Sequence, residues 1–142
     1  MIVLDTNVLS DVMQPAPNPA VVAWLNQQDI QTLYITAVTL AELRFGIARL
    51  EPGRKKTDLA QRLDMMLSQI FDRRILPFTS AATQVFADRM AAARLNGRAV
   101  GFQDAMIAAT VAAHDFAIAT RDISPFEAMG VPVINPWSNS SQ

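Results

Sequence analysis

The N-terminal stretch Met1-Ile-Val-Leu-Asp-Thr-Asn7 places a short apolar run directly before three polar residues. A run of this length and composition predicts a buried strand over Ile2–Leu4, and the polar residues predict the turn that starts a helix over Thr6–Met13. A strand followed at once by a helix is typical of a parallel sheet, in which the polar residues after each strand gather at one edge. We therefore expect Asp5 at the ligand-binding edge of an α/β fold.

The rest of the chain repeats this alternation of short apolar runs and helical patterns. Further strands are predicted over Leu33–Ile35, Ile75–Leu76, Phe116–Ala119 and Val131–Ile134. Further helices are predicted to begin at Pro19, with Asn18 as its cap, after Thr36, at Arg54 (to about Asp72), after Thr79 or Ser80 (to about Leu95), over Phe102–Asp115 and over Ser124–Met129. Helices that connect parallel strands cover both faces of the sheet. The predicted fold class is therefore α/β, a three-layer sandwich with a central, mostly parallel β-sheet.

Length and composition fit one folded domain, which we place at residues 1–137, with residues 138–142 as a C-terminal tail. The hydrophobic content of 51% and charged content of 18% exclude a disordered chain. The net charge of −1 means that any contact with nucleic acid must come from a local basic patch or from a metal. The absence of cysteine fits a reducing cytoplasm and excludes thiolate chemistry.

The counts of the other reactive residues exclude further kinds of site. His114 is the only histidine, which excludes multi-histidine metal sites and catalysis by a histidine pair. Asp5 interrupts the N-terminal apolar run, so we predict no signal peptide. The uncharged stretches are too short, or too broken by proline and polar residues, to span a membrane. We expect a soluble, cytoplasmic protein.

Four acidic residues lie at the ends of predicted elements. Asp5 and Asp122 follow predicted strands, and Glu42 and Asp104 fall early in two helical patterns. If the strands are parallel and the helices start at the same edge, the four carboxylates converge on one crevice. A cluster of carboxylates has to be offset by a cation, and a hard divalent metal is the natural candidate. The pattern therefore indicates metal-dependent chemistry on phosphate.

Each acid also has a structural interpretation that stays open from the sequence alone. Asp5 is suited to cap a helix, and Asp104 to interact with a helix dipole. Glu42 lies in an apolar helix and could pair with a distant arginine, because Arg44 is on another face of that helix. Asp122 could be a loop carboxylate that accepts a backbone hydrogen bond.

Four segments that contain these acids carry a family resemblance. They are Leu4-Asp-Thr-Asn-Val-Leu-Ser10, Val38-Thr-Leu-Ala-Glu-Leu-Arg-Phe-Gly46, Asp104-Ala-Met-Ile-Ala-Ala109 and Ala119-Thr-Arg-Asp122. In this order and spacing they resemble the PIN-domain family, in particular bacterial toxins of the VapC type and their FitB-like branch. The resemblance covers nearly the whole chain, including the ending Ile134-Asn-Pro-Trp137. Phe102-Gln103 departs from the family pattern, because members of the family often have a pair of small residues at the two positions before the aspartate that corresponds to Asp104.

The resemblance implies a PIN-like fold and a ribonuclease site. Asp5, Glu42, Asp104 and Asp122 match the acidic quartet that binds Mg²⁺ or Mn²⁺, and Asn7 and Thr120 match positions of its polar support. The resemblance also implies the toxin of a type II toxin–antitoxin system. Such a toxin is a homodimer, is neutralised by an antitoxin with a DNA-binding N-terminal domain, and forms a higher-order complex with it.

The expected reaction is hydrolysis of an RNA phosphodiester bond by an endoribonuclease, with metal-activated water as the nucleophile. We expect Asp5 and Asp104 to be direct ligands, and Glu42 and Asp122 to act through water or at a second metal position. No side-chain general base is convincing. Candidate contacts to RNA phosphates are Arg44, Arg121, Arg54, Lys55 and Lys56.

Two alternatives to a metal-dependent ribonuclease are a different phosphate enzyme and a protein without catalytic activity. A phosphatase that forms an aspartyl-phosphate, or a phospho-accepting receiver domain, needs a lysine after a later strand, and no lysine follows Lys56. Such phosphatases also commonly need a second acid at position 7, which is Asn7 here. The other alternative is a catalytically weak PIN-like module that binds an antitoxin or RNA without cleaving it. The intact quartet argues against this module without excluding it.

Overall fold

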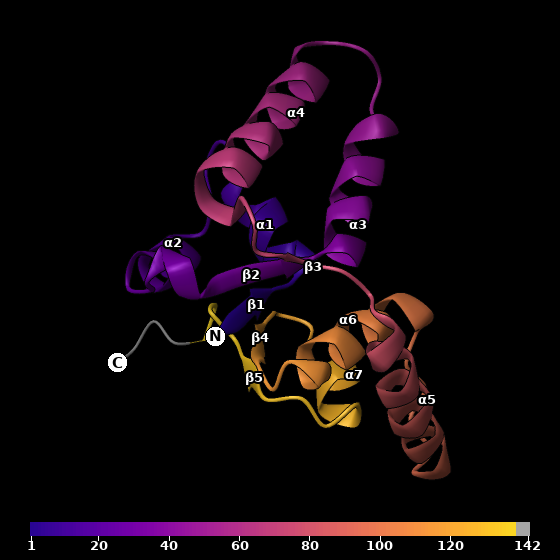
Figure 1. Cartoon of the computed structure of the whole chain (residues 1–142). Helices are drawn as coiled ribbons and strands as arrows, with labels where there is room; N and C mark the ends of the chain where they lie inside the picture. The colour runs from indigo at the N-terminus through magenta and orange to yellow at the C-terminus, as the bar shows by residue number, and fades with distance from the viewer. Residues whose placement is uncertain (139–142) are drawn as a thin grey trace.

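The computed structural model describes residues 1–138, so residues 139–142 of the predicted tail lie outside the described part of the chain. Its centre is a sheet of five strands in the order β3-β2-β1-β4-β5, and every neighbouring pair is parallel (Figure 1). The strands are β1 (Ile2–Leu4), β2 (Leu33–Thr36), β3 (Ile75–Leu76), β4 (Ala117–Ala119) and β5 (Val133–Ile134). The predicted α/β class is confirmed, with a sheet that is wholly parallel.

The helices begin and end close to the predicted positions. They are α1 (Thr6–Val12), α2 (Pro19–Asn26), α3 (Ala37–Ala48), α4 (Arg54–Met66), α5 (Ser80–Leu95), α6 (Phe102–Ala113) and α7 (Ile123–Ala128), with a 3-10 turn over Ile30–Thr32 and a π-helical turn over Leu67–Phe71 that continues α4. The side chains of Asn18, Thr36 and Thr79 cap α2, α3 and α5 as expected. Among the described residues, no helix has both the length and the apolar character to cross a bilayer.

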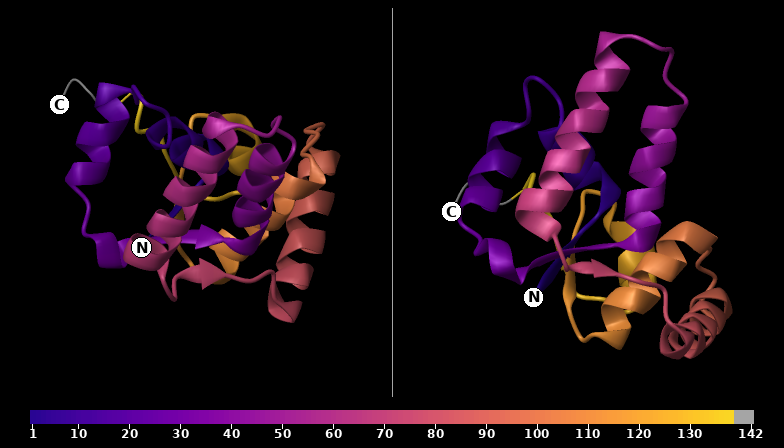
Figure 2. Two further views of the ribbon diagram at one scale, coloured as in Figure 1. Left: turned by 90° about the horizontal axis from the view of Figure 1, so that it is seen from above. Right: turned by 45° about the horizontal axis from the view of Figure 1, so that its top comes forward.

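Helices cover both faces of the sheet and make three layers (Figure 2). Alternate residues of a strand point to opposite faces, and both faces are buried here. Val3 and Ile118 belong to a core shared with α5, α6 and α7, whereas Leu4 and Ala119 belong to a second core shared with α1 to α4. Since both faces are covered, the strands are short apolar runs and do not alternate between apolar and polar residues.

The strand order reverses between β1 and β4, and this reversal positions the site. The chain proceeds from β1 to β2 on one side and from β4 to β5 on the other, so the connections diverge between the two central strands. Parallel α/β sheets bind ligands in the crevice that opens at the carboxyl ends of such strands. The backbone N–H of Asp5 donates to the carbonyl of Ala119 (3.0 Å), which joins the two strand ends at this point. The residues that follow β1 and β4 therefore emerge side by side.

Candidate active site

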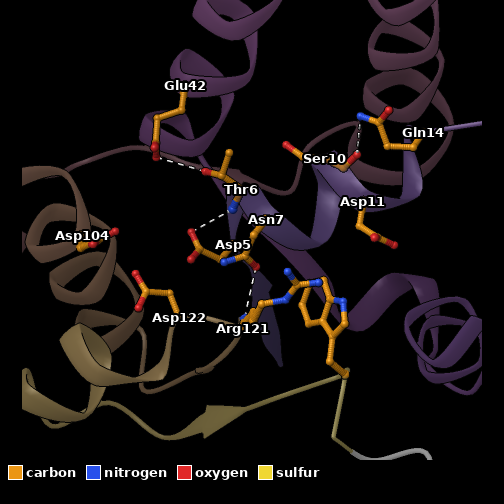
Figure 3. A pocket seen from close by; sticks show the side chains of 11 residues that line it. Asp5, Thr6, Asn7, Ser10, Asp11, Gln14, Glu42, Asp104, Arg121 and Asp122 are labelled. Carbon is orange, nitrogen blue, oxygen red and sulfur yellow. Dashed lines mark hydrogen bonds between the residues drawn. The ribbon is translucent and has the colours of Figure 1, made fainter. Parts of the chain in front are cut away.

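A pocket of about 540 Å³ lies at this edge of the sheet and contains all four predicted acids (Figure 3). Asp5 directly follows β1, Glu42 lies in α3, Asp104 lies in the first turn of α6, and Asp122 directly precedes α7. The residues that line the pocket are Asp5, Thr6, Asn7, Ser10, Asp11, Gln14, Glu42, Asp104, Arg121, Asp122 and Trp137. The fold thus brings together carboxylates that are up to 117 residues apart, from position 5 to position 122.

Asp5 is the most deeply buried of the four, with 5% of its surface exposed. One carboxylate oxygen, Oδ1, accepts a hydrogen bond from the backbone N–H of Thr6 (2.8 Å). The other oxygen, Oδ2, accepts one from the Thr120 hydroxyl (2.8 Å). Asp5 is therefore both the cap of α1 and a member of the acidic cluster, and the two interpretations of its position are compatible.

The Thr120 hydroxyl is the centre of a hydrogen-bond network under the pocket. It donates to Asp5, and it accepts from the side-chain amide of Asn7 (3.1 Å) and the backbone N–H of Asp122 (3.0 Å). The side-chain oxygen of Asn7 in turn accepts from the backbone N–H of Arg121 (3.3 Å). Asn7 and Thr120 therefore connect α1 to the loop after β4, and they fix the backbone on which Asp122 stands.

Glu42 is half-buried and is connected to the same network by a residue that the sequence did not single out. Its Oε1 accepts a hydrogen bond from the hydroxyl of Thr6 (3.1 Å), which joins α3 to the start of α1. The alternative interpretation was an ion pair with a distant arginine. In the structure, burial, the Thr6 bond and the neighbouring carboxylates of Asp5 and Asp104 determine the pKa of Glu42, without a contribution from a basic side chain.

Asp104 and Asp122 present their carboxylates without protein donors. Asp122 occupies the N-cap position of α7, but its side chain caps no backbone N–H there. Within residues 1–138 neither carboxylate accepts a hydrogen bond, so both depend on water or on a cation. The loop interpretation of Asp122, a carboxylate bonded to backbone, therefore does not apply.

Burial and mutual repulsion disfavour ionisation of this cluster. Burial is the largest influence and raises the pKa of Asp5, of Glu42 and of Asp104, the last to about 6. That pKa of Asp104 includes the effect of the negative charges of Asp5 and Asp122, which also raise it. No basic side chain is among the influences on these three pKa values. The pocket therefore holds carboxylates that lack a counter-charge from the protein.

The donor set fits a hard divalent cation that is shared with water and substrate. The donors are carboxylate oxygens, which suit Mg²⁺ and Mn²⁺. In the described part of the chain, no three histidine or acidic side chains stand close enough to form a ready-made ligand set. Mg²⁺ is normally bound by one or two carboxylates, several waters and substrate phosphate, so it does not require such a cage. The pocket thus suits a cation completed by water and phosphate.

The five basic residues predicted to contact RNA lie in different places relative to the acidic pocket. Arg121 lines the acidic pocket, and its guanidinium carbon lies 4.3 Å from the centroid of the Trp137 ring. Lys55 lines an adjoining groove of about 250 Å³ that shares Thr6, Ser10, Gln14 and Glu42 with the pocket. Arg121 and Lys55 are thus the predicted contacts that line the pocket or the groove that shares residues with it.

The other three basic candidates line neither the pocket nor this groove. Arg54 lines a hollow of about 470 Å³ beyond that groove, together with Lys55 and Arg62. Lys56 donates to the carbonyl of Ala48 (3.0 Å) and so closes the connection between α3 and α4. Arg44 is exposed on α3 and lines neither the pocket nor the groove.

Five lining residues were missed as site residues: Thr6, Ser10, Asp11, Gln14 and Trp137. A signal for three of them is present in the sequence, because polar residues recur at positions 7, 10, 11 and 14, the spacing of one helical face. Trp137 lies outside that helical pattern. Its ring does pack against the core beside α1 to α4, but it also forms a wall of the pocket.

Comparison with known proteins agrees with this geometry. The family model described as PIN domain matches residues 2–131. The chain is 48% identical to "VapC ribonuclease Y4jK" of Sinorhizobium fredii, over 96% of this chain and 98% of the relative, and 42% identical to "Toxin FitB" of Neisseria gonorrhoeae, over 96% and 99%. A solved structure, "Structure of FitAB bound to IR36 DNA fragment", superposes with a TM-score of 0.91 at 41% identity, over 96% of each chain. The chain therefore belongs to the PIN-domain family.

Proposed function

We propose that this protein is a metal-dependent endoribonuclease that acts as the toxin of a type II toxin–antitoxin system. The observation that carries the proposal is the pocket of four carboxylates at the switch point of a parallel sheet, where no basic side chain influences the pKa of Asp5, Glu42 or Asp104. The names of the two relatives, a ribonuclease and a toxin, specify the substrate and the biological role. Mg²⁺ or Mn²⁺ is the proposed cofactor.

The four acids are proposed to have two kinds of role. Asp5 and Asp104 would hold the cation directly, and Glu42 and Asp122 would act through water or at a second metal position. When bound, the cation activates water and neutralises charge on the phosphate that is attacked. Thr120 and Asn7 keep the Asp5 carboxylate oriented by the hydrogen bonds described above.

Side chains outside the quartet bind substrate but do not transfer the proton. His114, the only histidine, follows α6, packs against Phe116 and does not line the pocket. A histidine general base is therefore excluded. Arg121 lines the acidic pocket, Lys55 lines the adjoining groove, and both are the proposed contacts for phosphates of the RNA backbone.

We further propose that the protein is a homodimer and binds a cognate antitoxin with a DNA-binding N-terminal domain, in a higher-order complex. The FitAB relative is bound to a DNA fragment. The present chain has a net charge of −1, so it provides little general attraction for DNA. A partner that supplies the DNA-binding surface accounts for both observations.

The test is RNA cleavage by the purified full-length protein without partner proteins. We expect Mg²⁺ or Mn²⁺ to support cleavage, EDTA to stop it, and Asp104→Asn to abolish it. Asp88→Asn is the matched control, because Asp88 is exposed on α5 and bonds only to Gln84 among the described residues. If RNA bound to the wild-type protein stays intact with both ions, the alternative of a non-cleaving PIN-like module is correct.

A further inference from the structure

Arg121 is a basic residue in an acidic pocket, but it does not pair with the acids. It lines the pocket together with Asp5, Asp104 and Asp122. Within the described residues its guanidinium donates no hydrogen bond, and it lies instead over the ring of Trp137, 4.3 Å from the centroid. Figure 3 shows the Arg121 side chain on the side of the pocket away from Glu42 and Asp104.

The Trp137 ring is a fixed platform for this contact. The backbone N–H of Trp137 donates to the side-chain oxygen of Asn135 (3.0 Å), which forms a turn directly after β5. The backbone N–H of Thr120 donates to the carbonyl of Ile134 (2.9 Å), so this turn is tied to the loop after β4, which carries Arg121. The ring itself packs against the core that contains Leu4.

Without this platform, an exposed arginine beside several carboxylates would be attracted to them. An Arg–carboxylate pair is frequently bidentate and would take up the oxygens that a cation needs. Stacking on tryptophan is a competing attraction, which holds the guanidinium flat against the ring. A stacked guanidinium keeps its in-plane N–H groups available, and these groups match the oxygens of a phosphate.

We propose that Trp137 is a positioning residue that holds Arg121 at the rim of the pocket. In that position Arg121 leaves the carboxylates open to the cation, and its guanidinium binds a phosphate of the RNA substrate. The second part of this inference rests on the proposed ribonuclease function. The first part concerns only the metal-free arrangement of Arg121 and the acids. The two parts can be measured separately.

The experiment compares four variants of the full-length protein with the wild type: Trp137→Leu, Trp137→Phe, Arg121→Gln and the double variant Trp137→Leu/Arg121→Gln. The first readout is the KM and kcat for cleavage of an RNA oligonucleotide. The second is the Mn²⁺ concentration that gives half of the maximal rise in Tm, measured without RNA at pH 7.5. Trp24→Leu is the matched control, because Trp24 is buried in the same core and lines none of the pocket.

The proposal predicts a different pattern for each variant. Trp137→Leu raises the KM about tenfold and also raises the Mn²⁺ midpoint several-fold, because the released Arg121 pairs with the acids. Arg121→Gln raises the KM alone. The double variant keeps the high KM but regains the wild-type Mn²⁺ midpoint. Trp137→Phe, which keeps an aromatic face, stays within about threefold of wild type in both readouts.

The outcomes that overturn the proposal are equally specific. Trp24→Leu is expected to lower Tm without changing the KM or the Mn²⁺ midpoint. If Trp137→Leu also lowers Tm and changes neither the KM nor the Mn²⁺ midpoint, the role of Trp137 is purely structural and the proposal is wrong. A double variant that still binds Mn²⁺ weakly would exclude capture of the acids by Arg121. If the wild type does not cleave RNA at all, the proposed function fails, and the Mn²⁺ readout still decides the role of Trp137.

Discussion

Asp5 and Asp104 are carboxylates of one pocket with opposite surroundings. Both oxygens of Asp5 accept hydrogen bonds from the protein, whereas Asp104 has no donor among the described residues. Asp104 lies in the first turn of α6, which favours a negative charge, but burial and the neighbouring charges of Asp5 and Asp122 outweigh that effect and raise its pKa to about 6. The comparison indicates that the fold supports the Asp5 carboxylate in advance and gives the Asp104 carboxylate no partner, which the proposed cation would supply.

The largest effects are expected when the negative charge of Asp5 or of Asp104 is removed. We expect Asp5→Asn and Asp104→Asn to reduce RNA cleavage by more than about 100-fold, because each removes a proposed direct ligand. Their effects on the metal-free protein should have opposite signs. Asp104→Asn removes a charge that lacks a counter-charge and should raise Tm by about 2–4 °C at pH 7.5 in EDTA. Asp5→Asn should lower Tm, because its amide group cannot accept from both Thr6 and Thr120.

Thermal unfolding in EDTA, measured beside RNA cleavage for each variant, is the readout. The Asp88→Asn variant again controls for the loss of one negative charge at an exposed position. The comparison between Asp5 and Asp104 would be wrong if both substitutions changed Tm in the same direction.

The hydrogen-bond network is the next target. Thr120→Val removes the donor to Asp5 and the acceptor for Asn7 and for the backbone of Asp122. We expect a loss of about 1–3 kcal/mol in the free energy of unfolding and a fall of about 10- to 100-fold in cleavage. Thr110→Val is the control, because the Thr110 hydroxyl is part of α6 and bonds back to the carbonyl of Met106 (2.8 Å).

Thr110→Val should leave cleavage at the wild-type level, since Thr110 does not line the pocket. Equal losses of cleavage in the two valine variants would mean that the hydroxyl of Thr120 has no special role in orienting Asp5. Chemical denaturation and initial cleavage rates would separate these two results.

A smaller effect is expected from pH. The pKa of Asp104 is raised in the folded protein, so ionisation of this group destabilises the metal-free fold as pH rises from about 4 through about 6. The Tm advantage of Asp104→Asn in EDTA should therefore be largest above pH 7 and should disappear near pH 4. Protons compete with the cation for the same oxygen atoms, so stabilisation by Mn²⁺ should weaken as pH falls through about 6. A Tm difference that does not vary with pH would contradict the raised pKa of Asp104.

The positions of the strands and of the four acids could be predicted from local patterns. Each strand is a short apolar run with polar or capping residues beside it, and the acids directly follow such runs or lie early in helices. The spacing places Asp5 and Asp122 at the carboxyl edge once the sheet is parallel. The cap and ligand interpretations of Asp5 looked like alternatives because the sequence does not reveal that its two oxygens face different donors.

The remaining parts of the site depend on packing between distant segments. The hydroxyl of Thr6 bonds to Glu42, 36 residues away, and no local pattern indicates this contact. The distribution of the basic residues also depends on packing, because the α3–α4 hairpin sends Lys55 toward the groove and Lys56 toward the end of α3. Trp137 resembles any other half-buried aromatic residue in the sequence, and only the folded chain places it beneath Arg121.

The most direct test of the central claim is calorimetric titration of the full-length wild-type protein and of Asp104→Asn with Mn²⁺ at pH 7.5, without RNA. The pocket described here predicts saturable binding by the wild type, and binding at least about tenfold weaker by the variant. Absence of saturable binding by the wild type, or equal affinity in the two proteins, would contradict the claim that these unneutralised carboxylates form a metal site.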